Sequence, residues 1–353
     1  MGSTFGKRHP VLTEQVLKCM RRALRGSTSY TYQTGIATYT TFCKIHRLRP
    51  IPAQPMILAS FAAHMHLTYN LSPSTITTYL YGVKAFHTQL GIHCDLTTGV
   101  LQQVLRGIRR SLYGVGGERH KPRKKLPITL KILHNLKKHV FAKGRWPKQD
   151  ATMIWAAMCS ATNGLLRSGE FCVKGRKWKN NPKLLIVAAL NTADTNTYKL
   201  HLRDTKTDTF GAGTTVHLFR DNTSTCPVAA LEEHLKHKTT SSAGDPLFAW
   251  KGTGKPLTYT ELVRVLRSLL QEIGEQPDRY GGHSFRRGGA TSLARNGTPD
   301  HIIQILGRWN SFCYRAYIDQ DIDCIRQLVI RSSARAQSFS AHAARGPSYD
   351  PHA

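Results

Sequence analysis

The sequence predicts a mainly helical protein with a small antiparallel β-sheet in its second half, an α+β fold in two domains. Apolar residues recur at helical spacing over most of the 353 residues. Two alternating runs, Tyr198–Thr205 and Thr214–Phe219, flank a glycine-containing turn, as the strands of a hairpin do. A stretch rich in Gly, Pro and Lys at residues 113–127 separates the two halves. We therefore expect a helical domain at 1–115, a basic linker at 116–127, a second domain at 128–331 and a disordered tail at 332–353.

The first domain is expected to be a bundle of four or five helices. Ser72 has the character of an N-cap, with a proline in the first helical turn after it. The expected segments are Glu14–Leu24, a helix from Ser27 to about Phe42, Met56–Leu67, Ser72–Leu90 and Thr98–Leu112.

The second domain is expected to place a small sheet between helices. An apolar, β-branched run at Leu184–Leu190 predicts a strand beside the hairpin. The expected helices are Leu130–Phe141, Ala151–Thr162, Val228–Lys236, Tyr259–Ile273, Phe285–Arg295, Pro299–Leu306 and about Asp321–Ile330.

The net charge of +29 is concentrated in the first part of the chain. Residues 1–118 carry a net +10 (13 basic, 3 acidic), and residues 119–148 carry +11 with no acidic residue. Such a field favours a polyanionic partner, because each neutralised phosphate releases condensed counterions. A solvated basic surface is the simpler alternative, and a nuclear-localisation patch is a further role for the basic linker.

Other classes of protein are disfavoured. No apolar run approaches the roughly 18 residues of a membrane span, and the N-terminus lacks the apolar core of a signal peptide. The eight cysteines include no CxxC pair, which favours reduced intracellular thiols over disulfides or zinc. There is no GxGxxG or GxxxxGK[ST] motif, and no HExxH or acidic metal triad. We expect no cofactor and no metal.

A C-terminal stretch holds the residues with the clearest chemistry. His283 and Arg286, in Gly282-His283-Ser284-Phe285-Arg286, share one face of a helix at its first turn, where free N–H groups favour an anion. A guanidinium binds two phosphate oxygens, and an imidazole moves a proton near neutral pH. Taken alone, this pair is more often a structural His beside a surface Arg.

Three further elements have ordinary structural explanations when taken singly. Arg167 opens a helix after a glycine turn, and Glu170 is placed to hold its guanidinium or to cap the helix. Lys206 lies beside the hairpin turn, where a solvent-exposed lysine is the common case. Trp309 follows Leu306-Gly307-Arg308, and Tyr317 supplies a phenol that is either a nucleophile or a packed aromatic ring.

In their order along the chain, these elements resemble the tyrosine recombinase (phage integrase) family, whose catalytic set runs Arg, Lys, His-x-x-Arg, His or Trp, Tyr. The resemblance covers roughly residues 27–330 and implies a helical, SAM-like core-binding domain followed by a catalytic domain. The amino-acid sequences of Gly281–Ala290 and Leu306–Trp309 are most similar to those of recombinases of eukaryotic DIRS and Crypton elements.

The resemblance implies a role for each residue. Arg167 and Arg286 would bind the non-bridging phosphate oxygens, Lys206 would protonate the 5′-oxygen, and His283 would assist proton transfer. Tyr317 would attack to give a 3′-phosphotyrosyl link, with Glu170 in support.

Two positions leave alternatives open. Most members have His where Arg308 stands, and some use Trp in this role. We assign the role, which combines packing with hydrogen bonding by the indole N–H, to Trp309 and regard Arg308 as an additional phosphate contact. Tyr317 follows Arg308 by nine residues, the usual interval, and Tyr314 is the other candidate nucleophile.

The resemblance implies double-stranded DNA as partner and a homo-oligomer on DNA, dimer to tetramer, with neither a membrane nor a small-molecule substrate. The last helix would dock on a neighbouring protomer or pack on its own domain. The expected DNA-binding residues of the linker are Arg119, Lys121, Arg123, Lys124 and Lys125. A eukaryotic host implies the nucleus, and any other host the cytoplasm. The competing functions are a type IB topoisomerase and an inactive, recombinase-derived DNA-binding protein.

Overall fold

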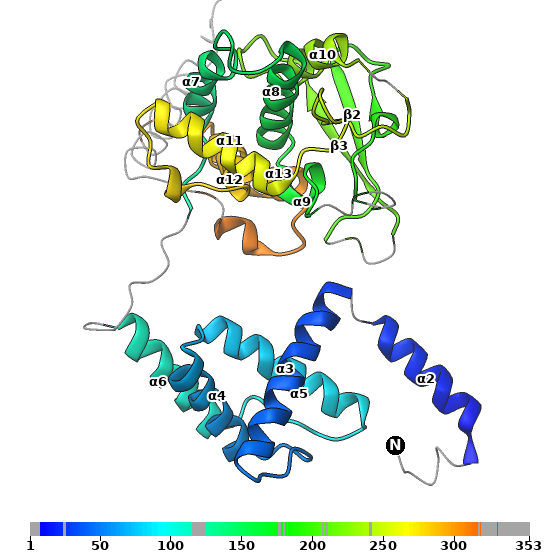
Figure 1. Ribbon diagram of the computed structural model, residues 1–353, viewed down its shortest axis with the longest axis vertical. Helices are drawn as coiled ribbons and strands as arrows, with labels where there is room; N and C mark the ends of the chain where they lie inside the picture. The colour runs from blue at the N-terminus through cyan, green and yellow to red at the C-terminus, as the bar shows by residue number, and fades with distance from the viewer. Residues whose placement is uncertain are drawn as a thin grey trace, which may run out of the picture. The chain divides into compact units, whose positions relative to one another are not determined.

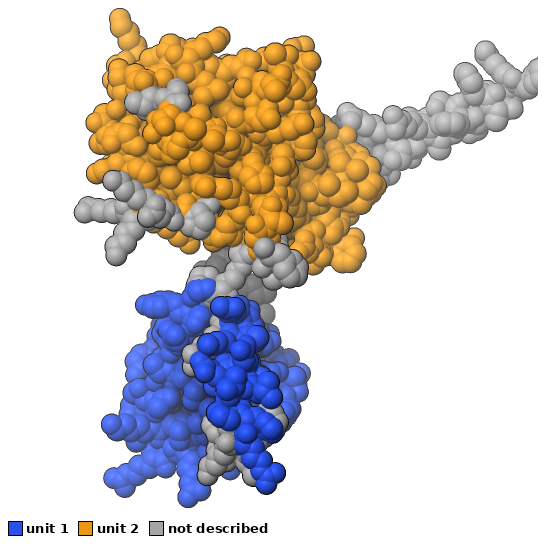
Figure 2. Space-filling view, turned by 90° about the vertical axis from the view of Figure 1, so that its right-hand side faces the viewer, with its two compact units in different colours: residues 1–123 blue, residues 124–353 orange. Residues whose placement is uncertain are grey.

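The chain divides into two units, residues 1–123 and 124–353 (Figures 1 and 2). The computed structural model describes residues 8–23, 26–114, 125–175, 178, 181, 183–206, 208, 211–239, 242–316, 318 and 330. The division falls inside the stretch that we expected to be a linker. Its last residues belong to the second unit, because the Leu126 and Ile128 amides donate to the carbonyls of Arg279 and Ser284, at 2.7 and 2.9 Å.

The described part of unit 1 is helical. Its helices are α2 (Pro10–Arg22), α3 (Gly26–Ile45), α4 (Pro55–Tyr69), α5 (Pro73–Gln89) and α6 (Gly99–Tyr113). α3 packs along α5 and α4 along α6. Ser72 is the N-cap of α5, since its hydroxyl accepts the Thr75 amide at 3.2 Å. The core of this bundle includes Tyr39, Phe42, Leu58, Phe61, Met65, Ile76, Leu80, Leu101 and Leu112.

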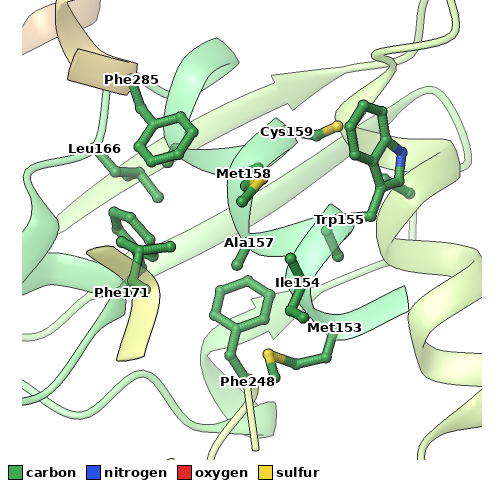
Figure 3. Close-up of a cluster of buried hydrophobic side chains, with 14 of the residues drawn as sticks. Met153, Ile154, Trp155, Ala157, Met158, Cys159, Leu166, Phe171, Phe248 and Phe285 are labelled. Carbon is green, nitrogen blue, oxygen red and sulfur yellow. The ribbon is translucent and has the colours of Figure 1, made fainter. Parts of the chain in front are cut away.

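Unit 2 is built around α8 (Lys148–Asn163). Its side chains from Gln149 to Thr162 are all buried, because other elements cover it on every side. α8 packs against α7 (Leu130–Val140), α10 (Pro227–His237) and α12 (His283–Arg295). Figure 3 shows that side chains of α8 meet Leu166, Phe171 and Phe285 in one apolar cluster. Because Leu166 and Phe171 flank Arg167, and Phe285 precedes Arg286, this core fixes the backbone of two candidate site residues.

The remaining elements complete unit 2. They are α9 (Ser168–Phe171), η1 (Val187–Ala189), β1 (Leu190–Asn191), β2 (Thr197–Leu202), β3 (Thr214–Phe219), α11 (Tyr259–Glu272), η2 (Pro277–Arg279), α13 (Asp300–Gly307) and η3 (Phe312–Ala316). The three strands form one antiparallel sheet in the order β1-β2-β3, with Leu200 opposite Val216. A mainly helical fold with a small antiparallel sheet is therefore confirmed.

The expected strand Leu184–Leu190 is wrong for most of its length. Only Leu190 and the residue after it pair with β2, and Val187–Ala189 form a 3₁₀ turn. The amides of Val187 and Ala188 donate to the carbonyls of Asp245 and Ala243, at 2.9 and 3.0 Å. The run is apolar because it is partly buried, but a neighbouring loop takes its backbone hydrogen bonds.

No helix within the described residues is long and apolar enough to cross a membrane. The described cysteines are free thiols. The expected last helix, Asp321–Ile330, lies outside the described residues apart from Ile330, as does the tail at 332–353.

Candidate active site

Arg167 is positioned by the turn that joins α8 to α9. Leu165 adopts a left-handed conformation (φ 46°), and Arg167 becomes the N-cap of α9. Glu170 both caps this helix and holds the arginine: its Oε2 accepts the Arg167 amide and its Oε1 accepts Nη1, each at 2.8 Å. The Glu170 side chain is only 4% exposed, so its charge is compensated by these contacts rather than by water.

His283 and Arg286 lie in the first turn of α12, as expected, but in different environments. His283 is the first residue of the helix and is exposed. Arg286 is fully buried, and its guanidinium donates to the carbonyls of Leu165 and Gly307. It also stacks over the Trp309 ring, with its Cζ 4.1 Å from the ring centroid. Arg286 thus joins the end of α8, the start of α12 and the end of α13.

Trp309 packs beneath Arg286 because the chain turns sharply after α13. Arg308 takes a left-handed conformation (φ 56°) as the C-cap of that helix. Trp309 is 6% exposed, and a Cβ on Gly307 would lie 1.6 Å from its ring, so glycine is required there. The packing part of the role expected for Trp309 is present in this contact with Arg286.

Arg308 makes contacts that its sequence position does not suggest. Its guanidinium donates to Glu170 Oε2 at 2.9 Å and to the carbonyls of Gly164 and Leu165 at 3.1 and 3.2 Å. Its side chain is 13% exposed. Glu170 therefore lies between two arginines, Arg308 and Arg167.

Lys206 lies in a turn just after β2 and is exposed. Its position beside the hairpin agrees with the sequence analysis, whereas part of the following turn lies outside the described residues.

The electrostatics of His283 show that the distant candidates gather around it. Burial of part of the ring, followed by the positive charges of Arg286, Arg167 and Lys206, lowers its pKa below the ordinary imidazole value of 6.5. Glu170 opposes this effect more weakly. Charges influence a pKa strongly only over a few ångströms to about one Debye length, roughly 10 Å. Arg286, Arg167 and Lys206 therefore form one cationic group around the His283 imidazole, whose neutral form is favoured at pH 7.

Tyr314 is a packed residue. It is 1% exposed, its hydroxyl donates to Asp300 Oδ2 at 2.8 Å, and its ring lies 6.1 Å from that of Trp309. Tyr317, the expected nucleophile, lies outside the described residues.

Of the expected DNA-binding residues of the linker, Lys125 is described. Its Nζ donates to the Asp278 carbonyl at 2.5 Å, within unit 2. The other four, Arg119, Lys121, Arg123 and Lys124, lie outside the described residues. Among the described residues, no three His, Cys, Asp or Glu side chains cluster as metal ligands would.

The sequence analysis missed the backbone anchors of the site. The Leu165 carbonyl accepts from both Arg286 and Arg308, and the Gly307 carbonyl accepts from Arg286. Every residue has a main-chain carbonyl, so the residue type does not indicate which carbonyls accept these hydrogen bonds. The one available signal was the Leu-Gly pair ahead of Arg308, which is typical of a helix end.

Comparison with protein families identifies a domain in the second half of the chain. Residues 195–320 match the model of the phage integrase family, a stretch that includes Lys206, His283, Arg286 and Tyr317 but not Arg167. No curated protein sequence matches the chain.

Several solved structures are similar. The Tn1549 transposon integrase in complex with transposon right end DNA has a TM-score of 0.58 and 15% identity, over 91% of this chain and 98% of that one. The XerH site-specific recombinase bound to palindromic difH substrate, a post-cleavage complex, gives 0.53 and 14%, over 78% and 69%. A lambda integrase dimer bound to a COC′ core site gives 0.51 and 13%, over 87% and 76%.

At these identities the structural similarity defines the fold, and the family match defines the domain. The chain therefore has the fold of the tyrosine recombinases and carries, at residues 195–320, a phage integrase family domain.

Proposed function

We propose that this protein is a site-specific DNA recombinase that cleaves and rejoins DNA strands through a 3′-phosphotyrosyl intermediate, for integration or excision of a mobile element. The observation that carries the proposal is that Arg167, Arg286 and Arg308 are joined through Glu170 and the Leu165 carbonyl, beside His283, whose pKa is lowered by partial burial and by nearby cations that include Lys206. Two arginines of the site, Arg167 and Arg308, share one carboxylate, that of Glu170, which leaves an excess of positive charge that suits a phosphodiester.

In the proposed cleavage step, one bond forms at phosphorus and one breaks. The Tyr317 oxygen forms a bond to phosphorus while the bond from phosphorus to the 5′-oxygen breaks. His283, in its neutral form, accepts the phenol proton, and Lys206 gives a proton to the departing 5′-oxygen. Arg167 and Arg286 stabilise the charge that develops on the non-bridging oxygens. The reverse step, with a new 5′-hydroxyl, rejoins the strand without a nucleotide cofactor.

The burial of Arg286 places one condition on this mechanism. Its guanidinium has no exposed surface, so direct contact with the phosphate requires that neighbouring side chains move when DNA binds. Its charge already acts on His283 without such a movement.

The finer parts of the proposal rest on separate observations. The amino-acid sequence of residues 281–290 and 306–309 supports a DIRS- or Crypton-type element. This element type implies a nuclear location. A homo-oligomer on DNA is supported by an apolar surface of unit 2 that another chain would cover: Ile302, Ile305, Leu306 and Phe312 are 36%, 68%, 37% and 69% exposed.

A nicked suicide duplex that carries the element's terminal sequence tests the chemistry. We expect a covalent protein–DNA adduct from the wild-type protein and from Tyr314→Phe, and none from Tyr317→Phe. Tyr314→Phe is the matched control, because it removes a hydroxyl that is already bound to Asp300.

The other outcomes separate the alternatives. DNA binding without any adduct would support an inactive DNA-binding protein. An adduct lost in Tyr314→Phe but kept in Tyr317→Phe would reverse the nucleophile assignment. Relaxation of supercoils without exchange between two labelled duplexes would favour a topoisomerase.

A further inference from the structure

Three arginines of the site are joined by two shared acceptors. Glu170 accepts from Arg167 and from Arg308, and the Leu165 carbonyl accepts from Arg286 and from Arg308. Arg308 is the member common to both acceptors. A substitution of Arg308 therefore affects the positions of the Arg167 and Arg286 guanidiniums, which bind the phosphate in the proposed mechanism.

The terminal N–H groups of Arg308 are directed into the protein. Nη1 donates to the carbonyls of Gly164 and Leu306 at 3.1 and 3.2 Å, and Nη2 donates to the Leu165 carbonyl and to Glu170 Oε2 at 3.2 and 2.9 Å. A guanidinium has four terminal N–H groups, and here four acceptors meet them. The fifth donor, Nε, is buried and has no hydrogen-bond partner among the described residues. A phosphate contact would require at least one of these four bonds to break.

The backbone conformation sets this direction. Arg308 follows the last residue of α13 in a left-handed conformation, which points its side chain back across the turn at residues 164–165. A planar fork with fixed geometry can bond a carboxylate and two carbonyls at once, whereas the ammonium of lysine is a point charge without this geometry.

We infer that Arg308 is a positioning residue rather than a phosphate ligand. It fixes Arg167 through Glu170, and it fixes Arg286 through the shared Leu165 carbonyl. This inference rests on the proposed function, because it concerns the geometry of strand cleavage. It replaces the additional phosphate contact that the sequence suggested for Arg308.

The test compares Arg308→Lys and Arg308→Met with the wild-type protein on the nicked suicide duplex. We expect the first-order rate of adduct formation at saturating DNA to fall on the order of 10- to 100-fold in both variants, as for a misplaced catalytic group. The dissociation constant for the duplex and its salt dependence should stay within about twofold, since no phosphate contact is lost. The positive charge of lysine should not rescue the rate.

A double-mutant comparison shows whether the effect passes through Glu170. Glu170→Gln should slow the adduct step by itself and should add little to Arg308→Met, because two residues that act through one contact are not additive. Arg220→Met is the matched control. It breaks another Arg–Glu pair of unit 2, that with Glu232, and should leave the adduct rate unchanged.

Three results would overturn the inference. A wild-type adduct rate in Arg308→Met would show that Arg308 positions nothing. Weaker DNA binding with a salt slope reduced by about one would make Arg308 a phosphate ligand. Full additivity with Glu170→Gln would separate the two residues. If Arg308→Met does not fold, Arg308→Lys decides by the same criteria. Absence of any adduct from the folded wild-type protein would instead overturn the proposed function, and this inference with it.

Discussion

Arg308 and Trp309 are neighbours in the chain, yet their side chains have different partners. The left-handed turn at Arg308 sends its guanidinium to Glu170, while the Trp309 ring lies against Arg286. The sequence analysis placed one ambiguous role on this pair of residues. In the structure, Arg308 shares Glu170 with Arg167 and the Leu165 carbonyl with Arg286, whereas Trp309 packs against Arg286 alone.

The lowered pKa of His283 predicts how adduct formation depends on pH. Its pKa lies below 6.5 because of partial burial and the nearby cations Arg286, Arg167 and Lys206. At subsaturating DNA, where the rate reports the free protein, we expect adduct formation to be constant at neutral pH. On acidification it should fall with a midpoint below 6.5. The sign follows from the base role, since protonation removes the lone pair that accepts the phenol proton.

The same titration at saturating DNA supplies an internal comparison. A bound phosphodiester adds negative charge beside the imidazole and should raise its pKa, so the midpoint should move upward. His283→Gln should remove the acidic limb from the remaining activity. A midpoint that is equal in both conditions, or an acidic limb that persists in His283→Gln, would assign the titration to another group.

At the scale of elements, the contact between α12 and the end of α8 sets the site. A Cβ on Gly289 would lie 2.1 Å from the Thr162 carbonyl oxygen, so only glycine allows this approach. The contact brings the first turn of α12, with His283 and Arg286, beside the turn that carries Leu165 and Arg167. The buried helix α8, covered on all sides, provides the rigid support.

Gly289→Ala should therefore destabilise unit 2. Overpacking of this kind costs about 1–3 kcal/mol, and here the obstacle is backbone, which yields less easily than a side chain. We expect a lower midpoint of chemical denaturation for the unit 2 transition, together with a slower adduct step as α12 is displaced.

Gly169→Ala, in the short helix α9, is the control for Gly289→Ala, because a Cβ there meets nothing within 4 Å. It should leave the denaturation midpoint close to that of the wild-type protein. An equal loss of stability in both variants would mean that the close approach of α12 to α8 is not the cause.

The expected strand at residues 184–190 shows where local pattern fails at this scale. Its apolar, β-branched residues fit a strand, but their backbone groups bond to the loop at 243–247. A hydrophobic pattern indicates which residues are buried, but it does not indicate which segment pairs with their backbone N–H and C=O groups.

At the scale of the whole molecule, the charge distribution predicts how the protein binds DNA. Most of the +29 charge lies in residues 1–148, ahead of every candidate catalytic residue. Binding to duplex DNA of arbitrary sequence should therefore weaken steeply with salt, with a slope of about −0.9 per neutralised phosphate.

The contribution of the linker can be measured separately. We expect a variant with Gln at Arg119, Lys121, Arg123 and Lys124 to lose up to about one unit of salt slope for each phosphate contact removed. A control variant removes four exposed lysines of unit 2, at Lys199, Lys236, Lys251 and Lys255. Fluorescence anisotropy over a salt series provides the slopes. Equal losses in the two variants would contradict a specific role for the linker.

The sequence by itself determined the mainly helical fold, the positions of most helices, the hairpin and the identity of the candidate site residues. These features depend on local periodicity, on caps such as Ser72 and on a distinctive order of residue types, and all three can be recognised in the amino-acid sequence. The pairing of Arg167 with Glu170 belongs to this group, because they are three positions apart at a helix start.

Only the tertiary structure decided the rest. In the structure, Arg286 is buried, Arg308 donates a hydrogen bond to Glu170, and the Tyr314 hydroxyl donates one to Asp300. The acceptors that matter most are main-chain carbonyls, which every residue has, and they come from segments more than 100 positions away. Their choice depends on how closely α12 and α13 approach the end of α8, which is a property of packing that no local pattern records.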